Sequence, residues 1–358
     1  MTTITSSEIA RLVDGAVDLE WGDEWVRPWR IRLADRPFHH PAVVDTFAAG
    51  SPAGVRLRFA TTSRHVALIA DLVPPSRFPA PEATADLRCG DSVVRCGVAV
   101  GEGATFTFEG LPPGEKELEL WLPTLAAVHL RSLTVDDDAS IESVTDPRPR
   151  WVTHGSSITH CAWVPGPTDT WPARAAHQLD WHLTCLGFNG QCHMDPYVAR
   201  TIASLPADVI TVKIGINIHN YGSFRERAFG PAAHGFIQTI RDGHPTTPLT
   251  LVSPIISPER EDSGVSNIPV MVQGGEPIHG DLSLNRMREI LAEVVHDRRV
   301  AGDQHLDYLD GRELLGPADV EHLPDGLHPD PTGYSLMADR FAAHFAERAA
   351  LLAATDPR

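Results

Sequence analysis

Residues Trp151–Thr159 read WVTHGSSIT, and the fold can be worked out from this stretch. Its first three residues form a short strand-like run, and the glycine at position 155 ends that run. Ser156 and Ser157 follow at the carboxyl end of the predicted strand. Ligands bind beyond this edge in an open α/β sheet. A strand that ends in serines therefore predicts a fold class and the place of a site.

Downstream, the sequence alternates between strand-like and helix-like segments. The run 209–214 (VITVKI) is typical of a strand that is buried on both faces. Asp195-Pro196 is a helix start signal. Such alternation predicts a three-layer α/β/α domain with a parallel sheet between two layers of helices. We expect strands at 151–153, 182–188, 209–214, 249–252 and 305–309, and helices at 171–180, 195–204, 232–241, 282–298 and 334–352.

Upstream, the texture is different, because short runs with period two are broken by glycine and proline. Examples are 55–59 (VRLRF) and 117–121 (ELELW), and the Leu111–Gly114 segment supplies a turn. This pattern predicts an antiparallel β-sandwich. The charged, proline-containing stretch that follows position 135 is expected to be a linker. We therefore divide the chain into a sandwich domain, residues 1–148, and an α/β/α domain, residues 149–358.

The composition limits the possible partners. The net charge is −17, with 47 acidic and 30 basic residues, so we expect neither nucleic acid nor an anionic membrane surface as a partner. The start of the chain lacks the features of a secretory signal. The five cysteines are irregularly spaced, although a Cys89–Cys96 bridge across a hairpin is conceivable. A cytoplasmic protein is expected, and the oligomeric state stays open.

Polar residues end four of the downstream segments. Ser157 follows the first strand, Asn189-Gly190 follows the second, Asn217 follows the third, and Asp325-Gly-Leu-His328 comes after the last. A histidine can take the proton of a serine hydroxyl, and an aspartate can orient that histidine. A glycine N–H and an asparagine amide can receive the oxyanion of a tetrahedral intermediate. This set of residue types, a serine, a histidine, an aspartate and two oxyanion donors, predicts nucleophilic acyl transfer.

These blocks resemble, in order, those of the GDSL or SGNH hydrolases. The resemblance spans about Trp151 to Leu352. It implies Ser157 as nucleophile, Asp325 and His328 as the acid–base pair, and Ser157, Gly190 and Asn217 as oxyanion donors. It implies no cofactor. Ser156 departs from the family's usual aspartate, and Ile218 departs from an aspartate that often follows the asparagine.

Other readings of the same residues stay open. Ser156 is the rival nucleophile, and a thiol nucleophile at Cys161 is a weaker alternative. His154, His160 and His193 are candidate substrate-binding residues. No close histidine pair of the His-x-x-x-His type predicts a metal site, so we expect none.

The sandwich followed by a hydrolase domain also resembles a two-domain subgroup of this family, which includes sugar esterases and an acyltransferase that tailors polyketides. Hydrolysis of an ester of a small molecule or glycoside is therefore the first-choice activity. Acyl transfer to a hydroxyl of a natural product such as a polyketide is the alternative, and a non-catalytic binding protein on a hydrolase scaffold is another. The insertion Ser257–Gly280 is either a lid or a plain surface loop.

Overall fold

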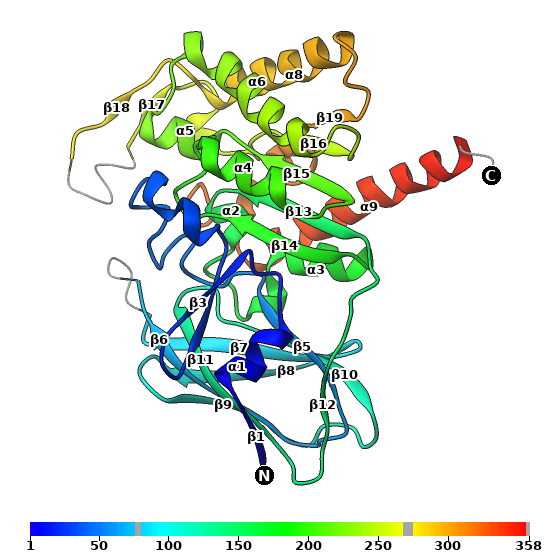
Figure 1. The fold of residues 1–358 in the computed structure, drawn as a ribbon. Coiled ribbons are helices and arrows are strands. Elements are labelled where there is room, and N and C mark those ends of the chain that lie inside the picture. Colours follow the sequence, from blue (N-terminus) through cyan, green and yellow to red (C-terminus); the bar gives the residue numbers. More distant parts are fainter. Residues whose placement is uncertain (76–79, 268–274, 356–358) are drawn as a thin grey trace. The chain divides into compact units, whose positions relative to one another are not determined.

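The computed structural model describes residues 1–75, 80–267 and 275–355 (Figure 1). The chain divides into two compact units. Unit 1 comprises Met1–Arg148 together with His160–Thr170 and Thr184–Leu186. Unit 2 comprises Pro149–Thr159, Trp171–Leu183 and Gly187–Arg358.

Unit 1 is a sandwich of two antiparallel sheets, as the alternating runs predict. One sheet has the order β3-β4-β11-β6-β9 with β1 also on β11, and the other has the order β12-β5-β10-β7-β8 with β2 on β5. The strands of the first sheet are β1 (Thr2–Thr5), β3 (Asp18–Trp21), β4 (Val26–Trp29), β6 (Val66–Val73), β9 (Ala104–Phe108) and β11 (Ala127–Val135). Those of the second are β2 (Val13–Asp14), β5 (Arg56–Thr61), β7 (Glu82–Cys89), β8 (Ser92–Ala99), β10 (Lys116–Trp121) and β12 (Ile141–Ser143).

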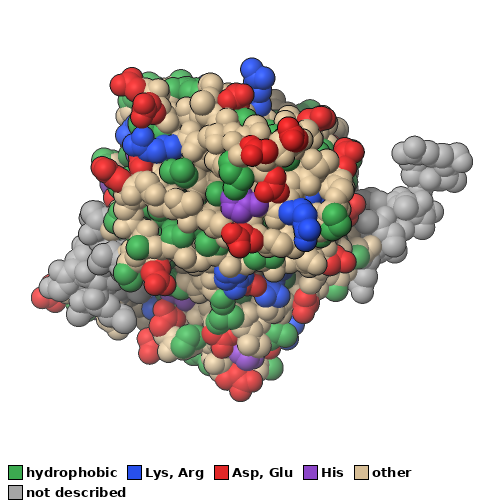
Figure 2. Space-filling view, turned by 90° about the horizontal axis from the view of Figure 1, so that it is seen from below, with side chains coloured by type: hydrophobic (Ala, Val, Ile, Leu, Met, Phe, Trp, Pro, Cys, Tyr) green, Lys and Arg blue, Asp and Glu red, His purple; other side chains and the backbone are tan. Residues whose placement is uncertain are grey.

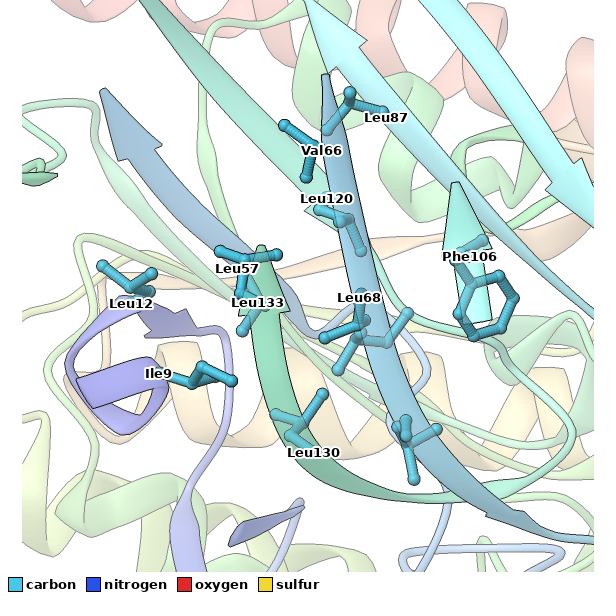
Figure 3. Packing of buried hydrophobic residues seen from close by; sticks show 14 of the residues in the cluster. Ile9, Leu12, Leu57, Val66, Leu68, Leu87, Phe106, Leu120, Leu130 and Leu133 are labelled. Atoms are coloured by element: carbon cyan, nitrogen blue, oxygen red, sulfur yellow. The ribbon is translucent and has the colours of Figure 1, made fainter. Parts of the chain in front are cut away.

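The core of unit 1 lies between its two sheets (Figure 3). Leu57 of β5 and Leu120 of β10 meet Leu68 of β6 and Leu133 of β11 there, and all four side chains are fully buried. The short helix α1 (Ser6–Ile9) adds Ile9 to the same core. Each buried leucine contributes about 1.5–3 kcal/mol relative to an exposed one, so this layer is a main source of the stability of unit 1.

A buried carboxylate explains why residues 160–170 belong to unit 1. Asp86 of β7 is fully buried, and its Oδ2 accepts hydrogen bonds from the Thr168 N–H (3.0 Å) and hydroxyl (2.6 Å). Arg95 on β8 donates to both oxygens of Asp86 and also contacts Asp169. A buried charge must be paired and hydrogen-bonded, and this network ties the segment to the sandwich.

Unit 2 contains a five-stranded sheet with the order β14-β13-β15-β16-β19, whose neighbours from β13 to β19 are parallel. Its strands are β13 (Arg150–Gly155), β14 (His182–Gly187), β15 (Val209–Lys213), β16 (Leu249–Val252) and β19 (Leu306–Leu309). The helices are α2 (Ser157–His160), α3 (Trp171–Gln178), α4 (Pro196–Ser204), α5 (Ile216–Tyr221), α6 (Glu226–Gly243), α8 (Leu284–Val300) and α9 (Pro331–Thr355). Strand β14 is added on one side of β13, and the later strands β15, β16 and β19 are added on the other side. The strand order therefore changes direction between β13 and β15, and open α/β sheets bind ligands at such a switch point.

Alternating side chains of β13 pack on helices at opposite faces of this sheet. The Trp151 ring lies 4.8 Å from Phe341 of α9 and 5.9 Å from Trp171 of α3, measured between centroids. The His154 ring stacks on Phe236 of α6 at 6.0 Å. Helices α3 and α9 pack together, as do α4 with α6 and α6 with α8. The expected three layers and parallel sheet are confirmed.

Two sequence-based expectations need comment. The helix expected from position 232 begins six residues earlier as α6 and runs through Pro231. Proline removes an N–H in its first turns, but the carbonyl that loses this partner belongs to exposed Arg227, which limits the cost. Within the insertion Ser257–Gly280, β17 (Val265–Ser266) pairs with β18 (Ile278–His279), while residues 268–274 lie outside the described residues.

The acidic side chains are spread over the face shown in Figure 2 rather than gathered into one patch. All five cysteines, Cys89 and Cys96 among them, are free thiols. Among the described residues, no helix combines the length and the apolar character that a membrane crossing requires.

Candidate active site

Three sheet strands deliver polar groups to the same edge of unit 2. Strand β13 ends at Gly155, and Ser157 begins α2 directly after it. A Cβ at Gly155 would lie 2.2 Å from Thr159 Oγ1, so only glycine allows the chain to turn so tightly there. Gly190 follows β14 with φ +66°, and Asn217 lies in the first turn of α5 after β15. Parallel strands with these neighbours bring the three loops together.

A row of hydrogen bonds joins the serine to the C-terminal loop. Ser157 Oγ lies 2.9 Å from His328 Nε2, and His328 Nδ1 lies 2.7 Å from Asp325 Oδ2. The other oxygen of Asp325 accepts the backbone N–H groups of Leu327 (2.9 Å) and His328 (2.6 Å). The carboxylate can only accept, so Nδ1 carries the proton and Nε2 offers its lone pair to the serine hydroxyl. Both ring nitrogens of His328 thus take part in the hydrogen-bonded row.

Electrostatics favour the ionised form of Asp325. Partial burial opposes ionisation, but the hydrogen bonds from the side chain and backbone of His328 outweigh it. Together with the Leu327 N–H, they hold the pKa of Asp325 well below its usual range. The Asp325 side chain is half exposed, whereas Ser157 is buried. The base therefore has an anionic partner throughout the neutral range.

Three N–H groups of the candidate oxyanion residues have no protein acceptor. In the part of the chain that the structure describes, neither Ser157 N–H, nor Gly190 N–H, nor the Asn217 Nδ2 group donates to a protein atom. Asn217 is almost fully buried, and its Oδ1 accepts the N–H of Cys192 at 3.0 Å. That bond fixes which way the amide lies, because a backbone N–H requires the oxygen. Nδ2 is left available as a donor, which is what an oxyanion requires.

A network that the sequence did not reveal holds the acid–base loop. Ser257 Oγ donates to the Gly326 carbonyl at 2.7 Å, and Arg260 Nη1 donates to Ser257 Oγ at 2.9 Å. Arg260 Nε also reaches the Asn220 side-chain oxygen on α5 at 3.3 Å. Burial lowers the pKa of this guanidinium, while nearby Glu259 and Asp325 raise it. The Asp325–His328 loop is thus tied to the helix that carries Asn217.

The rival nucleophiles have other surroundings. Ser156 is buried, and its Oγ accepts the N–H of Ile158 at 3.3 Å. Cys161 is fully buried, with φ at +54°. Ser157 is the serine hydrogen-bonded to His328.

The three candidate histidines have different surroundings. His154 is a buried residue of β13, and its Nε2 lies 3.4 Å from Cys192 Sγ. His160 belongs to unit 1, is buried, and contacts the Thr124 carbonyl at 2.7 Å. Only His193 is half-buried and lies beside the site loops, 3.0 Å from the Gly190 carbonyl. Substrate contact by any of them stays a prediction.

Comparison with known proteins identifies the family. A model of the GDSL-like lipase/acylhydrolase family matches residues 153–336, more than half of the 358 residues. The chain belongs to the GDSL-like lipase/acylhydrolase family. Residues 12–131 match a second model, the N-terminal domain of SsfX3. No curated protein sequence matches the chain significantly.

Three solved structures resemble nearly the whole chain. A salicylyl-acyltransferase, SsfX3 from a tetracycline biosynthetic pathway, is 29% identical, with a TM-score of 0.86 and 97% coverage of both chains. A GDSL-like lipase from Bacteroides ovatus is 23% identical, with a TM-score of 0.72 and the same coverage. An acetyl xylan esterase from Butyrivibrio proteoclasticus is 12% identical, with a TM-score of 0.64, covering 98% of this chain and 100% of its own. The last two show the fold alone. The GDSL-like chain is a serine esterase or acyltransferase with a β-sandwich in unit 1.

Proposed function

We propose that the protein transfers an acyl group through an acyl-enzyme on Ser157. The observation that carries this proposal is the hydrogen-bonded row Ser157–His328–Asp325, together with three N–H donors that no protein atom accepts from. A serine hydroxyl is a weak nucleophile until a neighbouring base removes its proton. The base here is held in the required tautomer by an ionised carboxylate.

The chemistry follows from these positions. Ser157 Oγ attacks the carbonyl carbon of an ester while His328 Nε2 takes the hydroxyl proton. The carbonyl oxygen becomes an oxyanion, which Ser157 N–H, Gly190 N–H and the Asn217 amide stabilise. His328 returns the proton to the departing alcohol, and an acyl ester on Ser157 remains. In the second half, His328 removes a proton from the incoming hydroxyl, which attacks the acyl carbon. The bond between that carbon and Ser157 Oγ then breaks, and His328 returns the proton to Ser157 Oγ.

Water is the first candidate for that incoming hydroxyl, because the matching family is one of lipases and acylhydrolases. A hydroxyl of a small natural product is the second candidate. The observation in its favour is the similarity over 97% of both chains to an acyltransferase, together with the match of residues 12–131 to that protein's N-terminal domain. A well-oriented acceptor can compete with water, since effective molarities reach roughly 10⁵–10⁸ M.

The test is to load Ser157 with an activated ester such as p-nitrophenyl acetate and to follow the acyl group with and without hydroxylated aromatic acceptors. Rapid release to water that no alcohol diverts supports hydrolysis. A long-lived acyl-enzyme that discharges only to an added alcohol supports transfer. Failure of any acyl group to accumulate or turn over, with the protein folded, would favour the non-catalytic binding protein instead.

A further inference from the structure

The loop that carries Gly190 is fastened to both ends of α5. Near the start of the helix, the Cys192 N–H donates to Asn217 Oδ1 at 3.0 Å. Beyond its end, Ser223 Oγ lies 2.8 Å from His193 Nδ1, and the His193 ring meets the Tyr221 ring edge-on at 5.5 Å. The loop that carries the proposed donor Gly190 is thus held against α5, the helix that carries the proposed donor Asn217.

His193 has one neutral tautomer that satisfies its hydrogen bonds to Gly190 and Ser223. Its Nε2 lies 3.0 Å from the Gly190 carbonyl, which can only accept, so Nε2 carries the proton. In the neutral ring Nδ1 then holds a lone pair and accepts from the Ser223 hydroxyl. Ser223 therefore orients the imidazole, and the imidazole Nε2–H donates a hydrogen bond to the Gly190 carbonyl.

This hydrogen bond restrains Gly190, whose backbone can adopt more conformations than that of other residues. Gly190 has φ +66°, a region that glycine enters readily and can also leave readily. The peptide group that joins Gly190 to Gln191 is held at both ends, because its N–H donates to the Phe188 carbonyl at 3.1 Å and its C=O accepts from His193. Without the histidine, one of these two restraints is lost.

We propose that His193, oriented by Ser223, is a positioning residue that fixes the Gly190 N–H for the oxyanion, an inference that rests on the proposed function. Donors that are already in place do not have to reorganise as charge develops in the transition state. In this inference His193 acts on the reacting atoms through its hydrogen bond to Gly190. Its loss should therefore slow the chemical step and leave substrate binding unchanged.

The experiment compares His193→Ala, His193→Gln and Ser223→Ala with the wild type, using p-nitrophenyl acetate turnover. His193→Ala should lower kcat about 10- to 100-fold with KM unchanged, because small misplacements in a site cost up to that much. A glutamine amide nitrogen can reach the Gly190 carbonyl, so His193→Gln should recover most of kcat. Ser223→Ala should cost less than His193→Ala. Exposed His305 provides the matched control, and His305→Ala should match the wild type.

Three results would overturn the inference. One is a wild-type kcat in His193→Ala, and another is a rise in KM alone, which would assign His193 to substrate contact. The third is a parallel loss of kcat and Tm that glutamine does not restore, which marks a purely structural role. Ser157→Ala in the same assay distinguishes failure of the acyl-enzyme proposal from failure of the His193 proposal. Activity in that variant would contradict the acyl-enzyme on Ser157, whatever the His193 variants show.

Discussion

The acid–base loop and the oxyanion pocket are two parts of one site that are assembled in opposite ways. Asp325 and His328 stand three residues apart, and three hydrogen bonds inside the loop set their geometry. The oxyanion donors follow three different strands, and they depend on contacts such as Cys192 to Asn217 that cross between loops. The geometry of the acid–base loop is thus determined by a few adjacent residues, whereas the geometry of the oxyanion donors depends on the register of the whole sheet.

This contrast predicts how each part fails. A substitution in the Asp325–His328 loop should allow His328 to adopt the wrong tautomer and leave the oxyanion donors in place. A change in the pocket should remove one donor of several and leave the base intact. Variants with matched size and unchanged fold can separate the two.

The largest expected effect in this comparison comes from Asp325→Asn. An amide can turn its N–H₂ group toward His328 and stabilise the wrong tautomer, and such a change lowers kcat on the order of 10⁴-fold in serine triads. Steady-state kinetics with p-nitrophenyl acetate measure this loss, with circular dichroism as the control for folding. A loss below about tenfold would mean that the loop does not need its carboxylate to set the base.

Asn217→Ala should have a smaller effect, on the order of 10²–10³ in kcat, because one oxyanion donor is lost. KM should stay close to that of the wild type, since the donor acts on charge that develops only in the transition state. The same kinetic assay separates the two parameters. If KM rises while kcat holds, Asn217 binds substrate and the pocket has been placed wrongly.

The smallest expected effect concerns stability and pH. The folded-state pKa of Asp325 lies below its ordinary value of 3.8, so the unfolded chain takes up the proton first as the pH falls. The stabilisation from the ionised carboxylate is complete above that ordinary value and is lost as the pH falls toward the folded-state pKa. Urea unfolding of the wild type and Asp325→Asn should give a constant difference from about pH 7 to 5 that shrinks below about pH 4. A difference that stays constant down to about pH 2 would contradict the lowered pKa.

The same contrast explains what the sequence could predict. Period-two runs, buried apolar strands and Asp-Pro helix starts depend on neighbouring residues, so they predicted the sandwich of unit 1 and the parallel sheet of unit 2. Ser157 after a strand and Asp325-x-x-His328 also carry local signals. The Ser223–His193 and Ser257–Gly326 contacts join segments far apart in the chain and have no local pattern. His160 stands three residues after Ser157, yet it belongs to unit 1, which no spacing could reveal.

Covalent trapping tests the central claim most directly. The protein is exposed briefly to p-nitrophenyl acetate or a fluorophosphonate, digested, and analysed by mass spectrometry, in parallel with Ser157→Ala and Ser156→Ala. The account predicts an adduct on Ser157 in the wild type and in Ser156→Ala, and none in Ser157→Ala. An adduct on Ser156 or Cys161, or continued turnover by Ser157→Ala, would contradict it.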